Sequence, residues 1–286
     1  MKKPKHSRDA GIDELKVGGL TLHGVTRGGV ETCLMVPELK LMFDVGMVPG
    51  GALGYGTILV SHGHADHLGG IAYFLAQRRM TGLKPPKVHA PEEIVEPLRR
   101  IFAAWGEIAG RPLEVELHGH GPGARVELGR GLRAFARRST HRVPSLAWVI
   151  ERESRRLRAE HVGRSHVELA ALRREGVEIT QPHREIALCV TGDTQIELLR
   201  DDPLVGSARV LVHEVTGWDD RRDVAATRRW GHTHLDEMID HAERHFSGEA
   251  LVLVHRSMRH SRAEADRLVR ERFPAALRER VHVFGR

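Results

Sequence analysis

Short apolar runs rich in valine, isoleucine and leucine recur along the chain, and stretches with helical periodicity separate them. We interpret the runs as buried strands: "TCLMV" (32–36), "LKLMFDVG" (39–46), "TILVS" (57–61), "IALCVTG" (186–192), "RVLVHEV" (209–215) and "ALVLVH" (250–255). Apolar positions three and four residues apart predict helices over 68–80, 91–105, 233–246 and 262–273. Strands that alternate with helices require helices on the outer sheet faces. The sequence therefore predicts α/β or α+β layers and excludes a bundle or an all-β barrel.

The length bounds the domain organisation. With 286 residues, 41% of them hydrophobic, the chain is expected to fold as one globular unit over 1–286. The stretch 151–185 interleaves arginine with glutamate and holds no aromatic residue, so it is predicted to be a surface insertion. The formal net charge of +6 favours polyanionic partners without identifying one.

The cysteines and the amino terminus bear on the compartment. Cys33 and Cys189 are the only cysteines and both lie in apolar runs, which indicates buried thiols in a reducing compartment. The lysines near the amino terminus precede no apolar segment, and no run approaches membrane-spanning length. We therefore expect a soluble, cytoplasmic protein with no membrane partner.

A histidine-rich segment, "HGHADH" at 62–67, directly follows a predicted strand. In a helix, residues two apart point to different sides, whereas a loop that leaves a strand can aim both His62 and His64 inward. Gly63 and the pair at 69–70 supply the backbone freedom of such a loop. The segment is therefore typical of a metal-binding loop.

Other predicted strands also end at possible metal ligands. One run stops at Asp193, another stops at His255, and His141 precedes a further predicted strand. The candidate ligands are His62, His64, Asp66, His67, His141, Asp193 and His255. Imidazole and carboxylate suit Zn²⁺, with Mn²⁺ or Fe also possible, and seven donors exceed the needs of one ion. Two ions that share a bridging carboxylate would use all seven. Such a pair lowers the pKa of a bound water and clamps both reacting oxygens of a phosphodiester, which predicts hydrolysis.

The remaining histidines carry weaker signals. His118 and His120 in "HGHG" lack the acid and histidine that follow in 62–67. Four others are expected to be solvated surface residues: His6, His161, His166 and His183.

The motifs resemble those of the metallo-β-lactamase superfamily, whose "HxHxDH" signature is met at 62–67 without substitution. Within it, the chain resembles the ribonuclease Z family over about residues 18–260. The matching segments, in order, are "GGVETCLMVPELKLMFDVG", "SHGHADHLGGI", "LKPPKV", "THRVPS", "REGVEIT", "TGDT", "HEVT", "GHTH" and "LVLVHRSMRH". The resemblance implies a four-layer αββα sandwich, two zinc ions per chain, a homodimer, and an endonuclease that removes the 3′ trailer of precursor tRNA.

The resemblance also implies roles for individual residues. His62, His64 and His141 would hold one zinc, and Asp193 would bridge it to a second held by Asp66, His67 and His255. Asp66 would in addition position or deprotonate the attacking water. Glu214 and His232 match an acid–histidine pair near the leaving group, and a carboxylate behind an imidazole keeps it protonated to donate. Asp44 is expected to orient a ligand.

The chain departs from the family pattern at five positions. They are Leu146, Ala147 and Trp148 after "THRVPS", and Arg256 and His260 around the last ligand. These changes predict an altered cleft wall. Five arginines are candidates for RNA contacts: Arg137, Arg138, Arg142, Arg256 and Arg259. Aromatic residues are scarce, which favours recognition of RNA by shape and backbone charge rather than by base stacking.

Two questions stay open at this point. The segment 151–185 occupies the interval in which the family carries a tRNA-gripping arm, and it fits either such an arm or a solvated helical hairpin. The rival functions are a small-molecule ester or thioester hydrolase and a non-cleaving RNA-binding protein. Glu214 and His232 argue against the first, because thioester hydrolysis does not need them, and an intact Asp66 argues against the second.

Overall fold

The computed structural model describes residues 12–285, in which the strands form two seven-stranded sheets. The first sheet holds β1 (Asp13–Val17), β2 (Leu20–Arg27), β3 (Glu31–Val36), β4 (Leu41–Phe43), β5 (Thr57–Leu59), β6 (Lys87–Pro91) and β7 (Glu116–His120), in that order. The second holds β8 (Arg125–Gly129), β9 (Leu132–Arg138), β10 (Leu146–Leu157), β11 (Thr180–Val190), β12 (Val210–Glu214), β13 (Ala250–Val254) and β14 (Val281–Val283).

Both sheets are built on one plan. Strands β1 to β4 and β8 to β11 pair antiparallel, whereas β4 to β7 and β11 to β14 pair parallel. Parallel strands need crossovers, and helices supply all of them except the one from β4 to β5. These are α1 (Ala65–Leu68), α2 (Ile71–Met80) and α3 (Glu92–Ile108) in the first half, and α5 (Glu197–Asp201), α6 (Pro203–Gly206), α7 (Val224–Arg229), α8 (Leu235–His245), α9 (Arg262–Arg272) and α10 (Ala275–Arg278) in the second.

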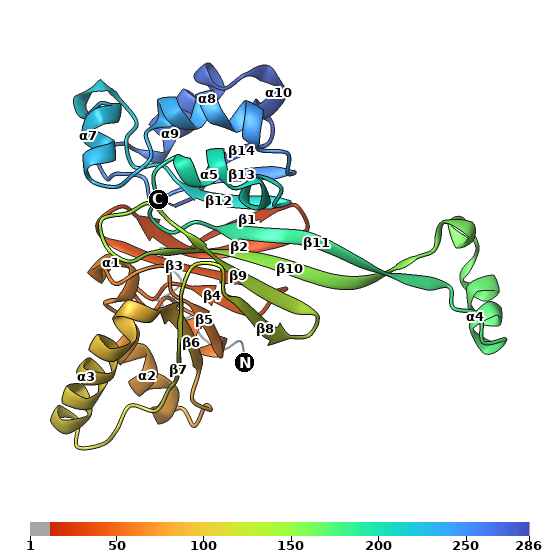
Figure 1. Ribbon diagram of the computed structural model, residues 1–286, viewed down its shortest axis with the longest axis horizontal. Coiled ribbons are helices and arrows are strands. Elements are labelled where there is room, and N and C mark those ends of the chain that lie inside the picture. The colour runs from red at the N-terminus through yellow and green to blue at the C-terminus, as the bar shows by residue number, and fades with distance from the viewer. Residues whose placement is uncertain (1–11, 286) are drawn as a thin grey trace, which may run out of the picture.

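Three apolar clusters hold the layers together. Phe43 and Leu59 of the first sheet and Trp148 and Val212 of the second belong to the cluster between the sheets. A second cluster packs α2 and α3 on the outer face of the first sheet, and a third packs α8 and α9 on the second. The two sheets thus lie face to face between two helical layers (Figure 1). The predicted four-layer αββα sandwich is confirmed.

The predicted elements match the structure closely. All six apolar runs contain a strand, and the four predicted helices correspond to α2, α3, α8 and α9. The helix predicted over 68–80 begins instead at Ile71, because Gly69 and Gly70 separate it from α1. Cys33 and Cys189 are fully buried free thiols, and burial raises the pKa of both. Among residues 12–285, no helix combines the length and apolarity needed to cross a bilayer.

A long arm projects from the second sheet (Figure 1). Strand β9 pairs with β10 only as far as Arg152, beyond which β10 and β11 continue as a two-stranded ribbon to a tip that contains α4 (His166–Arg174). The helical-hairpin alternative for 151–185 is therefore wrong. Arginine and glutamate face each other across the ribbon: Arg152 Nη2 lies 2.6 Å from Glu185 Oε1, and Arg184 Nε lies 2.8 Å from Glu153 Oε2. The interleaved charges thus form cross-strand pairs.

The predicted surface histidines have different outcomes. His166 is exposed and His183 is half-buried, whereas His161 is buried within the arm, so its predicted solvation is wrong. His6 lies outside the described residues.

Candidate metal centre

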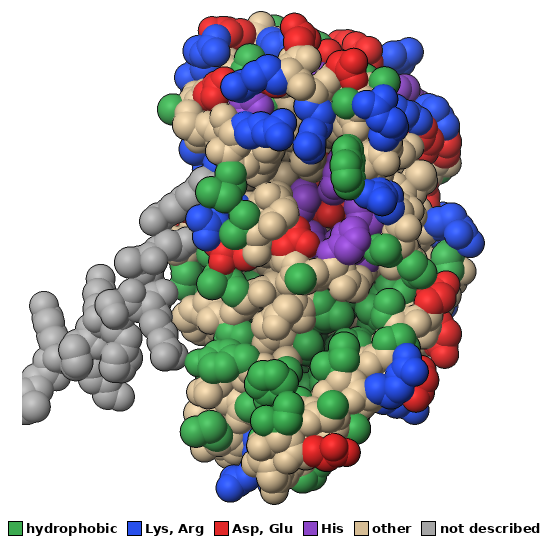
Figure 2. Space-filling view, turned by 90° about the vertical axis from the view of Figure 1, so that its left-hand side faces the viewer, with side chains coloured by type: hydrophobic (Ala, Val, Ile, Leu, Met, Phe, Trp, Pro, Cys, Tyr) green, Lys and Arg blue, Asp and Glu red, His purple; other side chains and the backbone are tan. Residues whose placement is uncertain are grey.

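The ends of several strands bring the seven predicted ligands to one edge of the sandwich. His62 and His64 lie in the loop after β5, and Asp66 and His67 lie on α1. His141 lies between β9 and β10, and the remaining two ligands, Asp193 and His255, follow β11 and β13. Figure 2 shows histidine and acidic side chains meeting in a hollow of this face, with basic side chains around it. A rigid sheet thus fixes ligands that are almost 200 residues apart in sequence.

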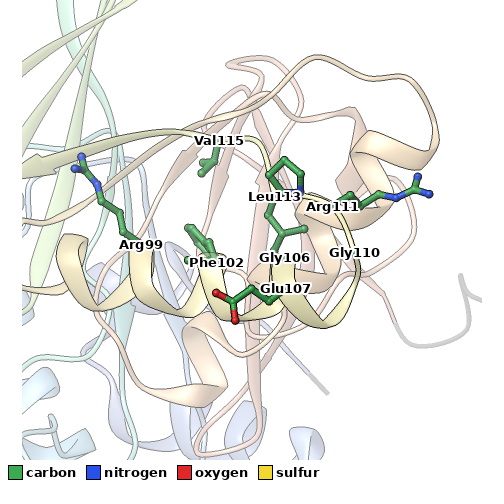
Figure 3. Close-up of a pocket in the computed structure, with 10 residues that line it drawn as sticks. Arg99, Phe102, Gly106, Glu107, Gly110, Arg111, Leu113 and Val115 are labelled. Atoms are coloured by element: carbon green, nitrogen blue, oxygen red, sulfur yellow. The ribbon is translucent and has the colours of Figure 1, made fainter.

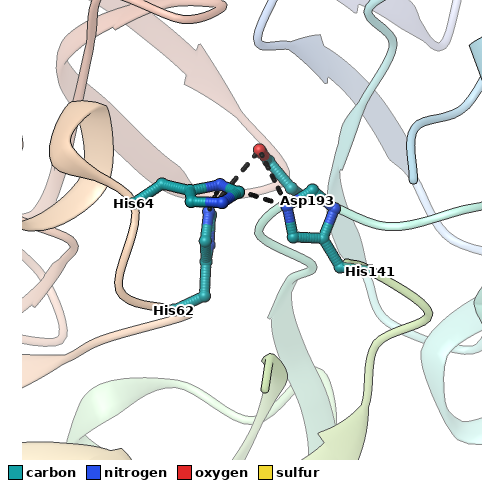
Figure 4. Close-up of side chains that lie close together, drawn as sticks. All are labelled: His62, His64, His141 and Asp193. Atoms are coloured by element: carbon teal, nitrogen blue, oxygen red, sulfur yellow. Dashed lines mark hydrogen bonds and ion pairs between the residues drawn. The ribbon is translucent and has the colours of Figure 1, made fainter. Parts of the chain in front are cut away.

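Three imidazoles converge on one oxygen of Asp193 (Figure 4). Asp193 Oδ2 lies 3.7 Å from His62 Nε2 and 3.9 Å from His141 Nε2. His64 Nδ1 lies 3.0 Å from His62 Nε2 and 3.3 Å from His141 Nε2. These four donor atoms lie within 4.8 Å of one another, close enough to surround one ion.

The other oxygen of Asp193 faces a second group. Asp193 Oδ1 lies 3.2 Å from His67 Nε2 and 3.4 Å from His255 Nε2. Asp66 Oδ2 completes this group at 3.3 Å from His255 Nε2 and 3.7 Å from His67 Nε2. Asp193 therefore stands between two sets of donors, one on each carboxylate oxygen.

The unpaired atoms of this cluster fit divalent metal ions. His67 Nε2 and Asp193 Oδ1 are both buried and neither has a hydrogen-bond partner, although leaving buried polar atoms unpaired is costly. Burial lowers the pKa of His62 and of His141, so both imidazoles are neutral and can ligate. The residues present thus fit a pair of divalent ions bridged by Asp193.

Asp44 and Ser61 hold the ligands from behind. Asp44 Oδ2 lies 2.8 Å from His67 Nδ1 and accepts a hydrogen bond of 2.8 Å from Ser61 Oγ. Ser61 Oγ also lies 3.0 Å from His62 Nδ1. Gly192, at a φ of +59°, lets the end of β11 approach, because a Cβ there would lie 2.3 Å from that of Ser61. These contacts fix the outward-facing nitrogen of each ring, so that Nε2 points at the centre.

A buried acid–histidine pair adjoins the ligands. Glu214 is fully buried, and its Oε1 lies 2.8 Å from His232 Nδ1 and accepts hydrogen bonds from the backbone N–H of Thr194 and Thr233. Burial alone would lower the pKa of His232, but the charge and hydrogen bond of Glu214 raise it to about 9. His232 is therefore protonated at neutral pH, with its Nε2 free to donate.

Thr216 links this pair to the metal ligands. Its hydroxyl donates to Glu214 Oε2 at 2.9 Å and lies 2.9 Å from His255 Nδ1. The sequence reasoning missed Thr216 and Ser61, although each lies inside a quoted motif, because a hydroxyl next to a ligand carries no spacing signal of its own.

His118 and His120 lie away from the cluster, where His120 Nε2 contacts His89 Nδ1 at 2.9 Å.

The predicted RNA-contacting arginines fall into two classes. Arg138, Arg142 and Arg259 are exposed, and Arg137 is half-buried in an ion pair with Asp202. Arg256 is buried, and its guanidinium donates to the carbonyls of His260 and Gly285. The predicted RNA contact of Arg256 is therefore wrong, because the side chain is buried and both terminal nitrogens donate to backbone carbonyls inside the protein.

The predicted effect of the five departures on the cleft wall is also wrong. Leu146, Ala147, Trp148, Arg256 and His260 are all buried. Trp148 Nε1 donates to Val60 O at 2.9 Å, and Leu146 N donates to Ser61 O at 2.9 Å. These two bonds tie the second sheet to the segment that carries His62, so Leu146 and Trp148 act from beneath the centre.

Comparisons with known proteins agree with this geometry. Residues 49–166 match the β-lactamase superfamily domain. The chain is 31% identical over 269 residues to tRNase Z TRZ1 of Arabidopsis thaliana, covering 93% of this chain and 95% of that protein. The metallo-β-lactamase fold protein YhfI of Bacillus subtilis superimposes with a TM-score of 0.63 at 12% identity, covering 91% of this chain and 94% of that one. The short form of human tRNase Z superimposes with a TM-score of 0.57 at 16% identity, again covering 91% of this chain and 94% of that one. The fold, the site and the extent of the sequence match place the chain in the tRNase Z (ribonuclease Z) family.

Proposed function

We propose that this chain is an endoribonuclease that removes the 3′ trailer of precursor tRNA. The observation that carries the proposal is the buried Glu214–His232 pair beside a set of donors for two ions. Hydrolysis of an activated ester needs the ions alone, whereas cleavage of RNA expels a basic 3′ oxygen that must be protonated. The Arabidopsis relative is named as a tRNase Z, which supports tRNA as the substrate.

We assign three steps to residues of the chain. Asp66 accepts a hydrogen bond from Gly29 N at 3.0 Å, and its side chain, at 14% exposed, is more open than the buried Asp193, so it can orient the attacking water and take its proton. His232 donates its proton to the leaving 3′ oxygen. Glu214 holds that imidazole in position and keeps it charged.

Zinc is the metal that we assign to both groups of donors. Imidazoles outnumber carboxylates three to one in the first group, and the second group, with Asp193 included, has two of each, a mixture of ligands typical of Zn²⁺. One ion would be held by His62, His64 and His141, and the other by Asp66, His67 and His255. Asp193 would bind both ions. When bound, the pair supplies Lewis acidity to the phosphate and a water that ionises near neutral pH.

The arm is the surface that we assign to tRNA at a distance from the centre. Arg164, Arg173 and Arg174 at its tip are exposed, and none makes an ion pair within residues 12–285. The ribbon arginines, by contrast, are paired with glutamates. The 12 residues of β10 start beside the metal centre and rise ~3.3 Å each, so the arm tip is roughly 40 Å away. A folded tRNA is long enough to contact both.

Replacing Arg164, Arg173 and Arg174 together with alanine is expected to weaken binding of precursor tRNA. Each lost phosphate contact reduces the slope of log affinity against log salt by about 0.9, so a loss of three flattens it by roughly 2–3. Fluorescence anisotropy over a salt series measures both quantities. The matched control, Arg184→Ala, removes an arginine already paired with Glu153. An unchanged salt slope in the triple variant would refute a role for the arm tip in phosphate binding.

We further propose a homodimer that buries the outer face of α3. Val95, Leu98 and Phe102 of this helix face the core, yet Ile101, Trp105 and Ile108 form a second apolar stripe, with exposures of 52%, 46% and 79%. Hydrophobic side chains cover the same part of the surface below the histidine hollow (Figure 2), and a pocket lined by Phe102, Leu113 and Val115 lies at the end of α3 (Figure 3). An exposed apolar patch of this kind suits a two-fold interface.

The double variant Trp105→Glu/Ile108→Glu is expected to convert the dimer to a monomer, because each protomer would bury two charges in the interface. Light scattering after size-exclusion chromatography gives the mass directly. Val167→Glu is the control, since Val167 is 77% exposed on the arm. A wild-type chain that is monomeric at micromolar concentration would overturn the proposal.

The proposed activity is tested on a tRNA transcript that carries a 3′ trailer. We expect the zinc-loaded chain to make one cut at the end of the acceptor stem, and the metal-stripped chain to make none until zinc is restored. A trailer that survives while bis(p-nitrophenyl) phosphate is hydrolysed would exclude this substrate and leave a hydrolase of other esters.

A further inference from the structure

One exposed aromatic side chain stands at the rim of the metal centre. Trp230 follows α7 and is 52% exposed, whereas Trp148 and Trp218 are buried. Its backbone N–H donates to Thr227 O at 3.1 Å. Arg228 of α7 pairs with both Glu197 and Glu237, so the segment that carries Trp230 is anchored to two other helices.

The next two residues tie Trp230 to the ligands. Gly231 O accepts a hydrogen bond of 2.8 Å from His141 Nδ1, and His232 contacts Glu214. Gly231 has a φ of +79°, and a Cβ there would lie 2.8 Å from His141 Nδ1 and 3.1 Å from Arg142 N. The segment 230–232 is therefore packed directly against the metal ligand His141.

Arg142 lies over the indole. Its guanidinium carbon is 4.6 Å from the centroid of the Trp230 ring, within cation–π range. Both residues are exposed, so this pair does not serve to cover the core. With the guanidinium over the ring, Trp230 still has 52% of its surface exposed to solvent. An aromatic face held rigidly beside a phosphodiester-cleaving site is the arrangement that binds an unpaired base.

We propose that Trp230 stacks on the unpaired nucleobase next to the phosphate that is cut, while Arg142 fixes the indole and contacts an adjacent phosphate. The proposal rests on the function proposed above and identifies a residue that positions the RNA 3′ end. It also revises the expectation that recognition rests on shape and backbone charge more than on base stacking. Trp230 is a positioning residue, since the chemistry is assigned to Asp66 and His232.

The test compares Trp230→Ala and Trp230→Phe in the zinc-loaded chain. Stacking on one base contributes enough that its loss lowers kcat/KM for the tRNA transcript by roughly 10- to 100-fold in Trp230→Ala. Phenylalanine keeps an aromatic face, so Trp230→Phe is expected to retain most of the rate. Two further transcripts each carry one abasic residue, one at the last nucleotide of the acceptor strand and the other at the first nucleotide of the trailer. On the transcript that lacks the stacked base, the rates of wild type and Trp230→Ala are expected to converge. Convergence assigns the loss to the contact between Trp230 and that base.

Three results would overturn the proposal. One is an undiminished rate for Trp230→Ala on the natural transcript. Another is a loss that persists in full on both abasic transcripts. The last is an equal loss on bis(p-nitrophenyl) phosphate. This substrate has no base to stack, so an equal loss would show instead that Trp230 supports His141.

A binding measurement keeps this proposal separate from the proposed function. A short RNA acceptor hairpin with 2-aminopurine at the stacked position loses fluorescence when the base stacks, whether or not the RNA is cut. Quenching by wild type and Trp230→Phe, but not by Trp230→Ala, supports stacking even if the trailer is not removed. Equal quenching by all three refutes it.

Discussion

Asp66→Ala is expected to lower the rate of precursor tRNA cleavage by at least about 10²- to 10⁴-fold, the usual contribution of a general base, while RNA affinity stays close to wild type. The carboxylate is both a donor to the second metal group, 3.3 Å from His255 Nε2, and the acidic group nearest solvent in that group. The RNA contacts proposed for Arg142 and the arm lie elsewhere. Single-turnover cleavage and fluorescence anisotropy measure the two quantities separately.

Asp66→Asn is the matched variant. Its amide keeps the size of the side chain and can still accept from Gly29 N, but it cannot take a proton. We expect it to bind more metal than Asp66→Ala and to remain almost as inactive. Wild-type turnover by either variant would exclude Asp66 from the reaction, and a parallel loss of RNA affinity would show that it supports the surface instead.

The apolar runs that were predicted from sequence to be strands are buried along almost their whole length. Strands β12 and β13 are buried at every residue, so they read as continuous apolar runs. Strands β1, β7 and β8 at the sheet edges expose alternate residues and carry charges such as Lys16, Glu116 and Arg125, so they were missed. Their strand conformation depends on the neighbour they pair with, which local composition does not reveal.

The arm shows a second limit of sequence reasoning. Arginines and glutamates interleaved at short spacing fit pairs along a helix as well as pairs across two strands. Arg152 faces Glu185, 33 residues later, and nothing near Arg152 indicates that partner. The surface location could be predicted from composition, whereas the ribbon could not.

The ligands of the metal centre could be predicted from the sequence, whereas the contacts that support them could not. The "HxHxDH" spacing and the strand ends indicated the seven ligands, because each is a chemically distinctive residue beside an apolar run, which His141 precedes and the other six follow. Contacts made by backbone atoms or hydroxyls have no comparable pattern in the sequence. Gly231 O on His141 and Thr216 on His255 became visible only in three dimensions. Arg256 shows the opposite error, since a charged residue beside a ligand proved to be buried structure.

His232→Ala is expected to slow tRNA cleavage by about 10²- to 10⁴-fold but to affect bis(p-nitrophenyl) phosphate far less. The leaving 3′ oxygen of RNA is strongly basic and needs a proton, whereas p-nitrophenolate is a weak base and departs without one. Comparison of the two rates in one preparation therefore isolates proton donation from metal binding. Equal losses on both substrates would show that His232, which lies 3.9 Å from Asp193 Oδ2, acts mainly as a metal ligand.

Glu214→Gln tests the same step without removing the imidazole. An amide oxygen can still accept from His232 Nδ1 and from the N–H groups of Thr194 and Thr233, but the negative charge is gone. In the wild type the donating form exists below a pKa of about 9 and is lost as the pH rises through it. Without the charge, burial lowers that pKa, so the alkaline limb of the pH–rate profile for tRNA is expected to move to lower pH. The profile for the p-nitrophenyl ester is expected to keep its alkaline limb. A profile for tRNA that does not move would assign the proton to another group, and Glu214 would then serve the fold through its backbone contacts alone.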